Sequence, residues 1–208
     1  MLDNIAQALA DLEDDQVLAA VNAALEAGAA PADILAACQK GMVRVGDKFA
    51  AGEYFISDLM YAADIFKRAS GTFASALRES GNKGAGTVVV GTAKGDIHDI
   101  GKDLVVSMLR AANYDVTDLG VDVPPEKFID AVKQTGAQVV GLSGLLTISF
   151  DSMRAIVEAF KTAGLRDSLK VMIGGGPTDA GVCSYVGADD WGHDATDAIK
   201  LCKNWIKE

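Results

Sequence analysis

The chain has 208 residues, of which 50% are hydrophobic, and its formal net charge at pH 7 is −10. This length and composition are typical of one or two globular domains and exclude a disordered chain. Acidic residues outnumber basic ones on both sides of residue 82, which argues against nucleic acid or an anionic membrane as the main partner.

The first eighty residues show only helical periodicity. Apolar side chains recur at helical spacing and predict four helices, over residues 3–12, 15–27, 31–51 and 57–80. Four such helices favour a four-helix bundle. The glycine-rich stretch 81–86 then predicts a linker, so we expect a helical domain over residues 1–82 and a second domain over residues 83–208.

In the second domain, strand-like and helix-like segments alternate. The predicted strands are residues 87–91, 115–119, 137–142, 170–174 and 189–191. The predicted helices are residues 100–112, 124–135, 150–163, 179–186 and 194–207. Such alternation indicates a parallel sheet that helices cover on both faces. We therefore predict an α/β domain of the flavodoxin-like (Rossmann-like) type, with five parallel strands in the order 2-1-3-4-5.

The most informative motif follows the first predicted strand and reads Asp96-Ile97-His98-Asp99-Ile100-Gly101. An aspartate two residues before a histidine can accept a hydrogen bond from one ring nitrogen while the other nitrogen faces a metal. Such a carboxylate fixes the tautomer of the ligating histidine and raises its basicity. The pattern indicates a metal ligand, and the alternative is an ordinary loop histidine.

Two further patches follow, Ser143-Gly144-Leu145 and Gly174-Gly175-Gly176. Ligands of open parallel sheets bind beyond the carboxyl ends of the strands. His98, Ser143 and Gly174 follow or end the first, third and fourth predicted strands. We therefore expect the three patches to meet at one edge of the sheet.

The three motifs in this order resemble the cobalamin-binding domain of cobalamin-dependent methionine synthase and of the corrinoid proteins of anaerobic methyltransferase systems. The resemblance covers nearly the whole chain. It implies that the cofactor is cobalamin or a related corrinoid, and that His98 is the ligand on the lower face of the cobalt. The implied mode is base-off/His-on, in which the nucleotide base of the cofactor leaves the metal.

The resemblance also implies a slot for the detached nucleotide tail. Ser143 would form a hydrogen bond with the tail base, and Leu145 would line the slot. Gly174 and Gly175 would let the tail approach the backbone, because glycine has no side chain.

The resemblance further implies a hydrogen-bonded relay that runs from cobalt through His98 and Asp96 to Ser149. Other residues would shape the loops around the corrin and its tail. These further members of the predicted cofactor-binding set are Thr92, Gly95, Gly101 and Thr147.

In the helical domain, residues 46–56 resemble the family's cap, which covers the methyl-bearing face of the corrin. Phe49 and Ile56 match two apolar cap positions, although Leu is commoner at the second, and Ser57 stands where Pro is common. The alternative is that Phe49 and Ile56 belong to the core of the bundle.

The function that this resemblance implies is that of a non-catalytic methyl carrier. It would pass a methyl group on cobalt from a substrate-specific methyltransferase to a second methyltransferase, which serves tetrahydrofolate or a similar acceptor, and a reductive activase would restore it. The overall resemblance leans towards an aryl methyl ether O-demethylase system, with methylamine, betaine and methanol systems open.

Three other functions compete with the methyl carrier. The cobalamin subunit of a mutase generally lacks the cap. A cobalamin-sensing regulator would need a DNA-binding domain, for which no basic helix-turn-helix remains. A cofactor-free interaction module would leave the three motifs without a purpose.

The compartment is predicted from the cysteines and from the N-terminus. Cys38, Cys183 and Cys202 are too scattered for a disulfide framework, and we expect reduced thiols in the cytoplasm. The N-terminus lacks a basic region before an apolar stretch, so we expect no signal peptide. No apolar run approaches the length of a membrane span.

Overall fold

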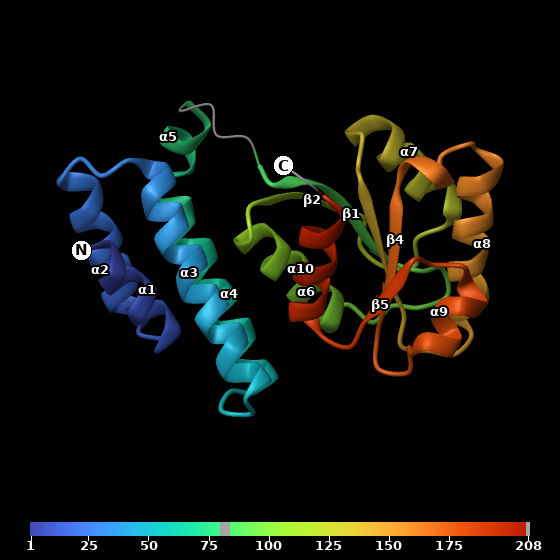
Figure 1. Ribbon diagram of the computed structural model, residues 1–208, viewed down its shortest axis with the longest axis horizontal. Coiled ribbons are helices and arrows are strands. Elements are labelled where there is room, and N and C mark those ends of the chain that lie inside the picture. The colour runs from blue at the N-terminus through green and yellow to red at the C-terminus, as the bar shows by residue number, and fades with distance from the viewer. Residues whose placement is uncertain (80–83, 207–208) are drawn as a thin grey trace. The chain divides into compact units, whose positions relative to one another are not determined.

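The computed structural model describes residues 1–79 and 84–206. The chain divides into two compact units, Met1–Lys83 and Gly84–Glu208, which we call the helical unit and the sheet unit (Figure 1). Part of the predicted linker, residues 81–83, and the predicted domain boundary after residue 82 lie outside the described residues.

The helical unit consists of helices whose apolar faces pack together. They are α1 (Leu2–Ala10), α2 (Asp14–Glu26), α3 (Pro31–Ala50), α4 (Ile56–Gly71) and the short α5 (Ala74–Glu79). Pro31 occupies the first turn of α3, where the missing N–H costs nothing. The first four helices bury Ile5, Leu9, Ile34 and Leu59 almost completely, which gives this unit its own core.

The single helix predicted over residues 57–80 is wrong, because the structure ends α4 at Gly71 and starts α5 at Ala74. Glycine weakens a helix, and the hydroxyl of Thr72 donates a hydrogen bond back to the Ala69 carbonyl oxygen at 2.7 Å. Phe73 is buried at the break, so apolar periodicity continues although the helix does not.

The sheet unit contains five parallel strands, in the spatial order β2-β1-β3-β4-β5, which confirms the predicted order. The strands are β1 (Gly86–Thr92), β2 (Tyr114–Asp118), β3 (Val139–Ser143), β4 (Lys170–Gly174) and β5 (Asp190–Gly192). The helices are α6 (Ile100–Ala111), α7 (Pro125–Thr135), α8 (Ser149–Thr162), α9 (Ala180–Val186) and α10 (Ala195–Trp205), and a 3-10 turn spans Arg166–Ser168.

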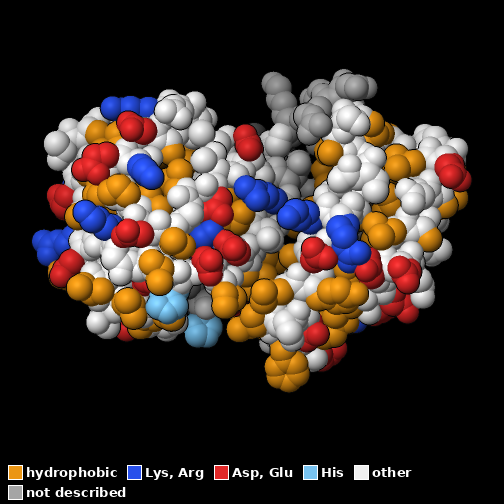
Figure 2. Space-filling view, turned by 180° about the vertical axis from the view of Figure 1, so that it is seen from behind, with side chains coloured by type: hydrophobic (Ala, Val, Ile, Leu, Met, Phe, Trp, Pro, Cys, Tyr) orange, Lys and Arg blue, Asp and Glu red, His pale blue; other side chains and the backbone are white. Residues whose placement is uncertain are grey.

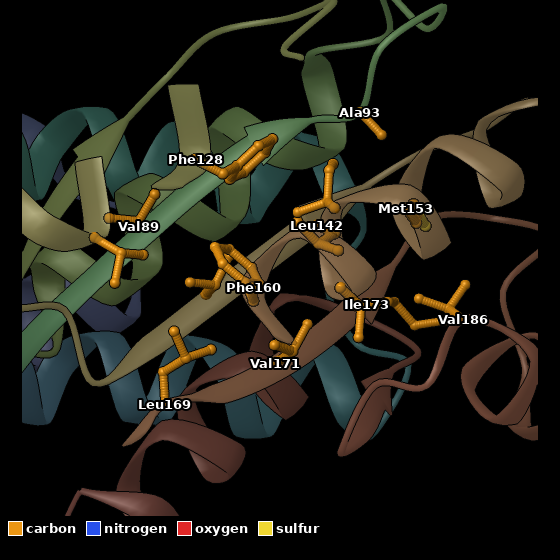
Figure 3. Packing of buried hydrophobic residues seen from close by; sticks show 14 of the residues in the cluster. Val89, Ala93, Phe128, Leu142, Met153, Phe160, Leu169, Val171, Ile173 and Val186 are labelled. Carbon is orange, nitrogen blue, oxygen red and sulfur yellow. The ribbon is translucent and has the colours of Figure 1, made fainter. Parts of the chain in front are cut away.

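Helices cover both faces of this sheet, with α6 and α10 on one face and α7, α8 and α9 on the other (Figure 1). Successive strand residues therefore enter different cores, as Val88 and Val89 of β1 do. In the larger core, Phe128 of α7 and Phe160 of α8 pack over Leu142 of the sheet (Figure 3). Among the described residues, we find no helix with the length and apolar character to cross a membrane.

The strand register aligns the carboxyl ends that carry the predicted site. Thr92 of β1 pairs with Ser143 of β3, and Ser143 pairs with Gly174 of β4. Gly174 in turn pairs with Gly192 of β5. The three sequence patches therefore meet at one edge of the sheet.

Candidate functional site

His98 lies in the loop between β1 and α6 and points one ring nitrogen at a buried carboxylate. The Asp96 side chain is fully buried, whereas the His98 side chain is 49% exposed. Oδ1 of Asp96 lies 2.7 Å from Nδ1 of His98 and accepts the His98 backbone N–H at 3.0 Å. A carboxylate at Nδ1 favours the tautomer with its proton there, which leaves the Nε2 lone pair for a metal.

The second oxygen of Asp96 is held by the loop that follows β3. Oδ2 accepts the backbone N–H of Leu145 at 2.6 Å and that of Leu146 at 2.9 Å. Burial opposes ionisation of Asp96, but the Leu146 and His98 N–H groups, the His98 ring and the Leu145 N–H outweigh it and hold the pKa of Asp96 well below its ordinary value. The side chain behind His98 is therefore a charged carboxylate at neutral pH.

The predicted hydrogen-bonded relay differs from the structure at Ser149. Ser149 is fully buried, and its hydroxyl donates to the Leu146 carbonyl oxygen at 2.5 Å. Because the Leu146 N–H donates to Asp96, Ser149 is linked to Asp96 through the Leu146 backbone and not through a direct hydrogen bond. Ser149 thus stabilises the loop that holds Asp96.

The β1 end of the site is also fixed by a predicted residue. Thr92 is fully buried, and its hydroxyl donates to the His98 carbonyl oxygen at 3.0 Å. Gly95 has a φ of +87°, a conformation that L-residues rarely adopt. These two residues therefore shape the loop from within.

Two glycines of the predicted slot, Gly174 and Gly175, and the loop glycine Gly101 differ in how much space the protein leaves for a side chain. A Cβ on Gly175, whose φ is +133°, would lie 2.0 Å from the Gly144 carbonyl oxygen. A Cβ on Gly174 would meet only the Gly192 carbonyl oxygen, at the ordinary contact distance of 3.6 Å. A Cβ on Gly101 would meet nothing within 4 Å. Of these three glycines, only Gly175 is required by the packing of the protein itself, so positions 174 and 101 leave space that a ligand could fill.

Apolar side chains around His98 are unusually exposed. Ile97, Ile100 and Ile148 are exposed by 72%, 65% and 68%, and Leu145 and Leu146 by 44% and 43%. Figure 2 shows the histidines on one face of the sheet unit with hydrophobic side chains beside them. Such a patch indicates a surface that binds an apolar partner or ligand. Thr147, in the same loop, is exposed as well.

The candidate cap segment of the helical unit carries exposed apolar side chains of its own. Ile56 is 56% exposed, so it does not belong to the core of the bundle, whereas Phe49 is half-buried. Phe55 is 71% exposed. Lys48 Nζ and the Tyr54 hydroxyl both donate to the Ala10 carbonyl oxygen, at 3.0 and 2.8 Å, which ties the segment to α1.

The side chains of this site suit a metal that is already bound within a cofactor. Within residues 1–79 and 84–206, no group of three or more His, Cys, Asp or Glu side chains could hold a metal ion. One imidazole with a free Nε2, an apolar rim and an open glycine edge instead fit a large, flat macrocycle whose metal needs one protein ligand. A corrinoid is such a group.

Several residues of the two units were not predicted from the sequence. Phe55, Leu146 and Ile148 are exposed apolar residues in loops, a signal that could have been read from their position beside the motifs. Lys102 is 3% exposed and binds Asp103 and Asp118 through Nζ. Its burial could not be read from a helical pattern, because lysine normally marks the solvent face.

Comparisons with known proteins cover almost the whole chain. The family described as B12 binding domain matches residues 86–200. A second family with the same description matches residues 1–72. Both units of the chain are therefore covered by families that are defined by B12 binding.

Relatives of nearly equal length are also found. The trimethylamine corrinoid protein of Methanosarcina barkeri is 38% identical over 95% of this chain and 92% of its own. The crystal structure of a cobalamin-binding protein from Desulfitobacterium hafniense is 40% identical, has a TM-score of 0.84, and covers 100% of this chain and 99% of its own. The methanol:cobalamin methyltransferase complex of M. barkeri contains a chain that is 32% identical, with a TM-score of 0.85 over 99% of this chain and 79% of that one.

Proposed function

Because the chain belongs to the B12-binding corrinoid proteins of methyltransferase systems, we propose that it carries a methyl group on cobalt, and that the group comes from a methylamine. The cofactor is cobalamin or a related corrinoid. The main support for the proposed site is the hydrogen bond between half-exposed His98 and buried Asp96. The methylamine rests on the likeness to a trimethylamine corrinoid protein, whereas the aryl methyl ether donor stays a prediction without such support.

In this proposal Nε2 of His98 would ligate the cobalt, in the base-off/His-on mode. The corrinoid, when bound, supplies a cobalt centre that takes up and releases a methyl group, and the protein supplies orientation and tuning. Asp96 keeps a proton on Nδ1 of His98 and so directs the Nε2 lone pair outwards. The space at Gly174, beside Ser143, would receive the nucleotide tail.

The helical unit would exclude water and oxidants from the reactive face of the corrin. Phe55 and Ile56 are the residues we assign to this cover, because both are exposed and apolar. Phe49, which is half-buried, would support them. An apolar cover without directional bonds can be displaced when a partner enzyme binds.

A methyl carrier of this kind would need partner enzymes. A substrate-specific methyltransferase would deliver the methyl group, since the methanol relative is described in complex with its methyltransferase. A second methyltransferase and a reductive activase would complete the cycle in the cytoplasm. The comparisons favour neither a mutase subunit nor a cobalamin-sensing regulator.

The test is a donor panel. The corrinoid-loaded protein is first reduced. It is then incubated with extract of the source cells and with one donor whose methyl group carries ¹³C, which is trimethylamine, methanol or a methoxylated aromatic. The protein is repurified, and its ¹³C label is measured by NMR. We expect label from trimethylamine, and much less in His98→Ala loaded to the same level. Label from methanol or the aromatic would overturn the methylamine donor, and label from none of the donors would overturn the carrier role.

A further inference from the structure

The loop that follows β2, residues 119–123, is hydrogen-bonded to the turn that carries Asp96. The Gly95 N–H donates to Oδ1 of Asp122 at 2.8 Å, and the Asp122 N–H donates to the Asp96 carbonyl oxygen at 2.9 Å. We infer that Asp122 is a positioning residue, which fixes this turn and thereby the direction of the His98 ring. The inference rests on the proposed function for the identity of what His98 binds.

The backbone of Asp122 adopts a conformation that most residues avoid. Its φ is +53°, in the left-handed region, where an L-residue with a Cβ is uncommon and aspartate and asparagine are tolerated best. Glycine would adopt this φ without strain, and glycine does stand at position 120, where φ is +80°. Aspartate at 122 adds what glycine lacks, a carboxylate that accepts the Gly95 N–H.

The loop is anchored on its other side by an ion pair whose lysine is buried. Nζ of Lys102, whose side chain is 2% exposed, donates to Oδ2 of Asp118 at 2.7 Å. Oδ1 of Asp118 accepts the Gly120 N–H at 2.9 Å, and the Gly120 carbonyl oxygen accepts the Thr92 N–H at 2.9 Å. Asp122 is therefore presented by a loop that is itself fixed.

Asp96 is held in two separate places as a result. The loop after β3 fixes its carboxylate, and Asp122 fixes its backbone. The first set of bonds holds the carboxylate against Nδ1 of His98, whereas the second holds the backbone of the turn. Without the Asp122 carboxylate, the Gly95 peptide can rotate, and the His98 ring loses its single direction.

Three variants separate the carboxylate from the backbone conformation. Asp122→Asn keeps an acceptor oxygen and tolerates the positive φ, whereas Asp122→Gly keeps the φ and removes the acceptor. Asn113→Gly is the matched control, because Asn113 also has a positive φ, of 69°, and lies where α6 ends and β2 begins. All three are compared with the parent chain.

The first readout needs no cofactor and is the hydrogen exchange of the Gly95 amide, followed by NMR. In Asp122→Gly we expect exchange about three- to tenfold faster, as for the loss of one hydrogen bond. We expect the parent rate within about twofold in Asp122→Asn and Asn113→Gly. A parent rate in Asp122→Gly would overturn the inference.

The second readout is electron paramagnetic resonance of the cobalt(II) corrinoid form. Asp122→Gly should bind the corrinoid but show a mixture of signals with and without nitrogen splitting from an imidazole, while Asp122→Asn should match the parent. Full splitting in Asp122→Gly would overturn the positioning role. A parent without such splitting would overturn the His98 ligation, and the exchange rates would still decide whether Asp122 holds the turn.

Discussion

The two segments that we assign to the corrinoid are built in opposite ways. In the sheet unit, the Asp96 carboxylate is fully buried and accepts four hydrogen bonds, one of them from the ring of His98. In the helical unit, Phe55 and Ile56 are exposed. Tyr54, just before them, is tied to α1 through the Ala10 carbonyl oxygen. A metal ligand needs one direction, which hydrogen bonds supply, whereas a removable cover needs apolar area and no direction.

The contrast predicts that substitutions in the sheet unit damage the fold or the ligand geometry, and that substitutions in the cap segment change protection of the cofactor. Trp191 and Trp205, the two tryptophans of the chain, both lie in the sheet unit. Their fluorescence therefore reports the unfolding of that unit within the full-length protein.

The largest effect should come from Gly175→Ala, which would break the sheet edge. Its Cβ would lie 2.0 Å from the Gly144 carbonyl oxygen at a φ of +133°, so we expect a loss of about 3 kcal/mol or more in urea unfolding. Gly174→Ala is the matched control, with a Cβ in ordinary contact. It should cost under about 1 kcal/mol and weaken corrinoid binding about tenfold, or 1.4 kcal/mol. Equal free energies of unfolding for the two variants would contradict the claim that only Gly175 is required by the packing of the protein.

Asp96→Asn should have the next largest effect, and a pH-dependent one. An amide cannot accept all four hydrogen bonds, so we expect a loss of about 2–4 kcal/mol in the free energy of unfolding at pH 7. The folded state lowers the pKa of Asp96, so its ionisation stabilises the fold above the ordinary value of 3.8 and this stabilisation fades as the pH falls below it.

The difference between Asp96→Asn and the parent should therefore be full at pH 7 and clearly smaller at pH 3, where the unfolded carboxylate is largely protonated. Asp115→Asn on the exposed side of β2 provides the control and should change little at either pH. A difference that is independent of pH would show that the Asp96 charge does not stabilise the fold.

The cap segment should give a smaller and different effect. Phe55→Ala combined with Ile56→Ala removes exposed side chains, so the helical unit should lose under about 1 kcal/mol in total. Oxidation of the cobalt(I) form by air should nevertheless become several-fold faster by stopped-flow absorbance. Phe49→Ala, at a half-buried position, should also speed this oxidation and should in addition lower the free energy of unfolding by about 1–3 kcal/mol. Unchanged oxidation rates in both variants would remove the cap role.

Tyr54→Phe should give the smallest effect. It removes the hydrogen bond to the Ala10 carbonyl oxygen, so we expect a loss of about 0.5–1.5 kcal/mol in the helical unit by circular dichroism. Tyr61→Phe, at a side chain that is 45% exposed, should change nothing measurable. Equal losses in the two variants would show that the anchor to α1 does not stabilise the segment.

The sequence was sufficient for the features that depend on local pattern. Alternating strands and helices require a parallel sheet, and the ends of its strands must lie at one edge. The register of Thr92, Ser143 and Gly174 shows this directly. His98 could be singled out as a candidate ligand from a short motif, because Asp96, which its ring contacts, is only two residues away.

The features that were not predicted from the sequence depend on tertiary contacts. The positive φ of Asp122 and the burial of Lys102 follow from the packing of one loop against another. The acceptor of Ser149 follows from the path of the Leu146 backbone. The break at Gly71 escaped because apolar periodicity continues across it to Phe73. None of these is determined by residue spacing.

The most direct test of the central claim is the electron paramagnetic resonance spectrum of the corrinoid-loaded protein in its cobalt(II) form. We predict nitrogen splitting from a protein imidazole. Growth with ¹⁵N-ring-labelled histidine should alter that splitting because the nuclear spin differs. His98→Ala should abolish the splitting, while His193→Ala should leave it intact. A spectrum that is insensitive to the labelled histidine, or unchanged in His98→Ala, would contradict the claim that His98 binds the cobalt.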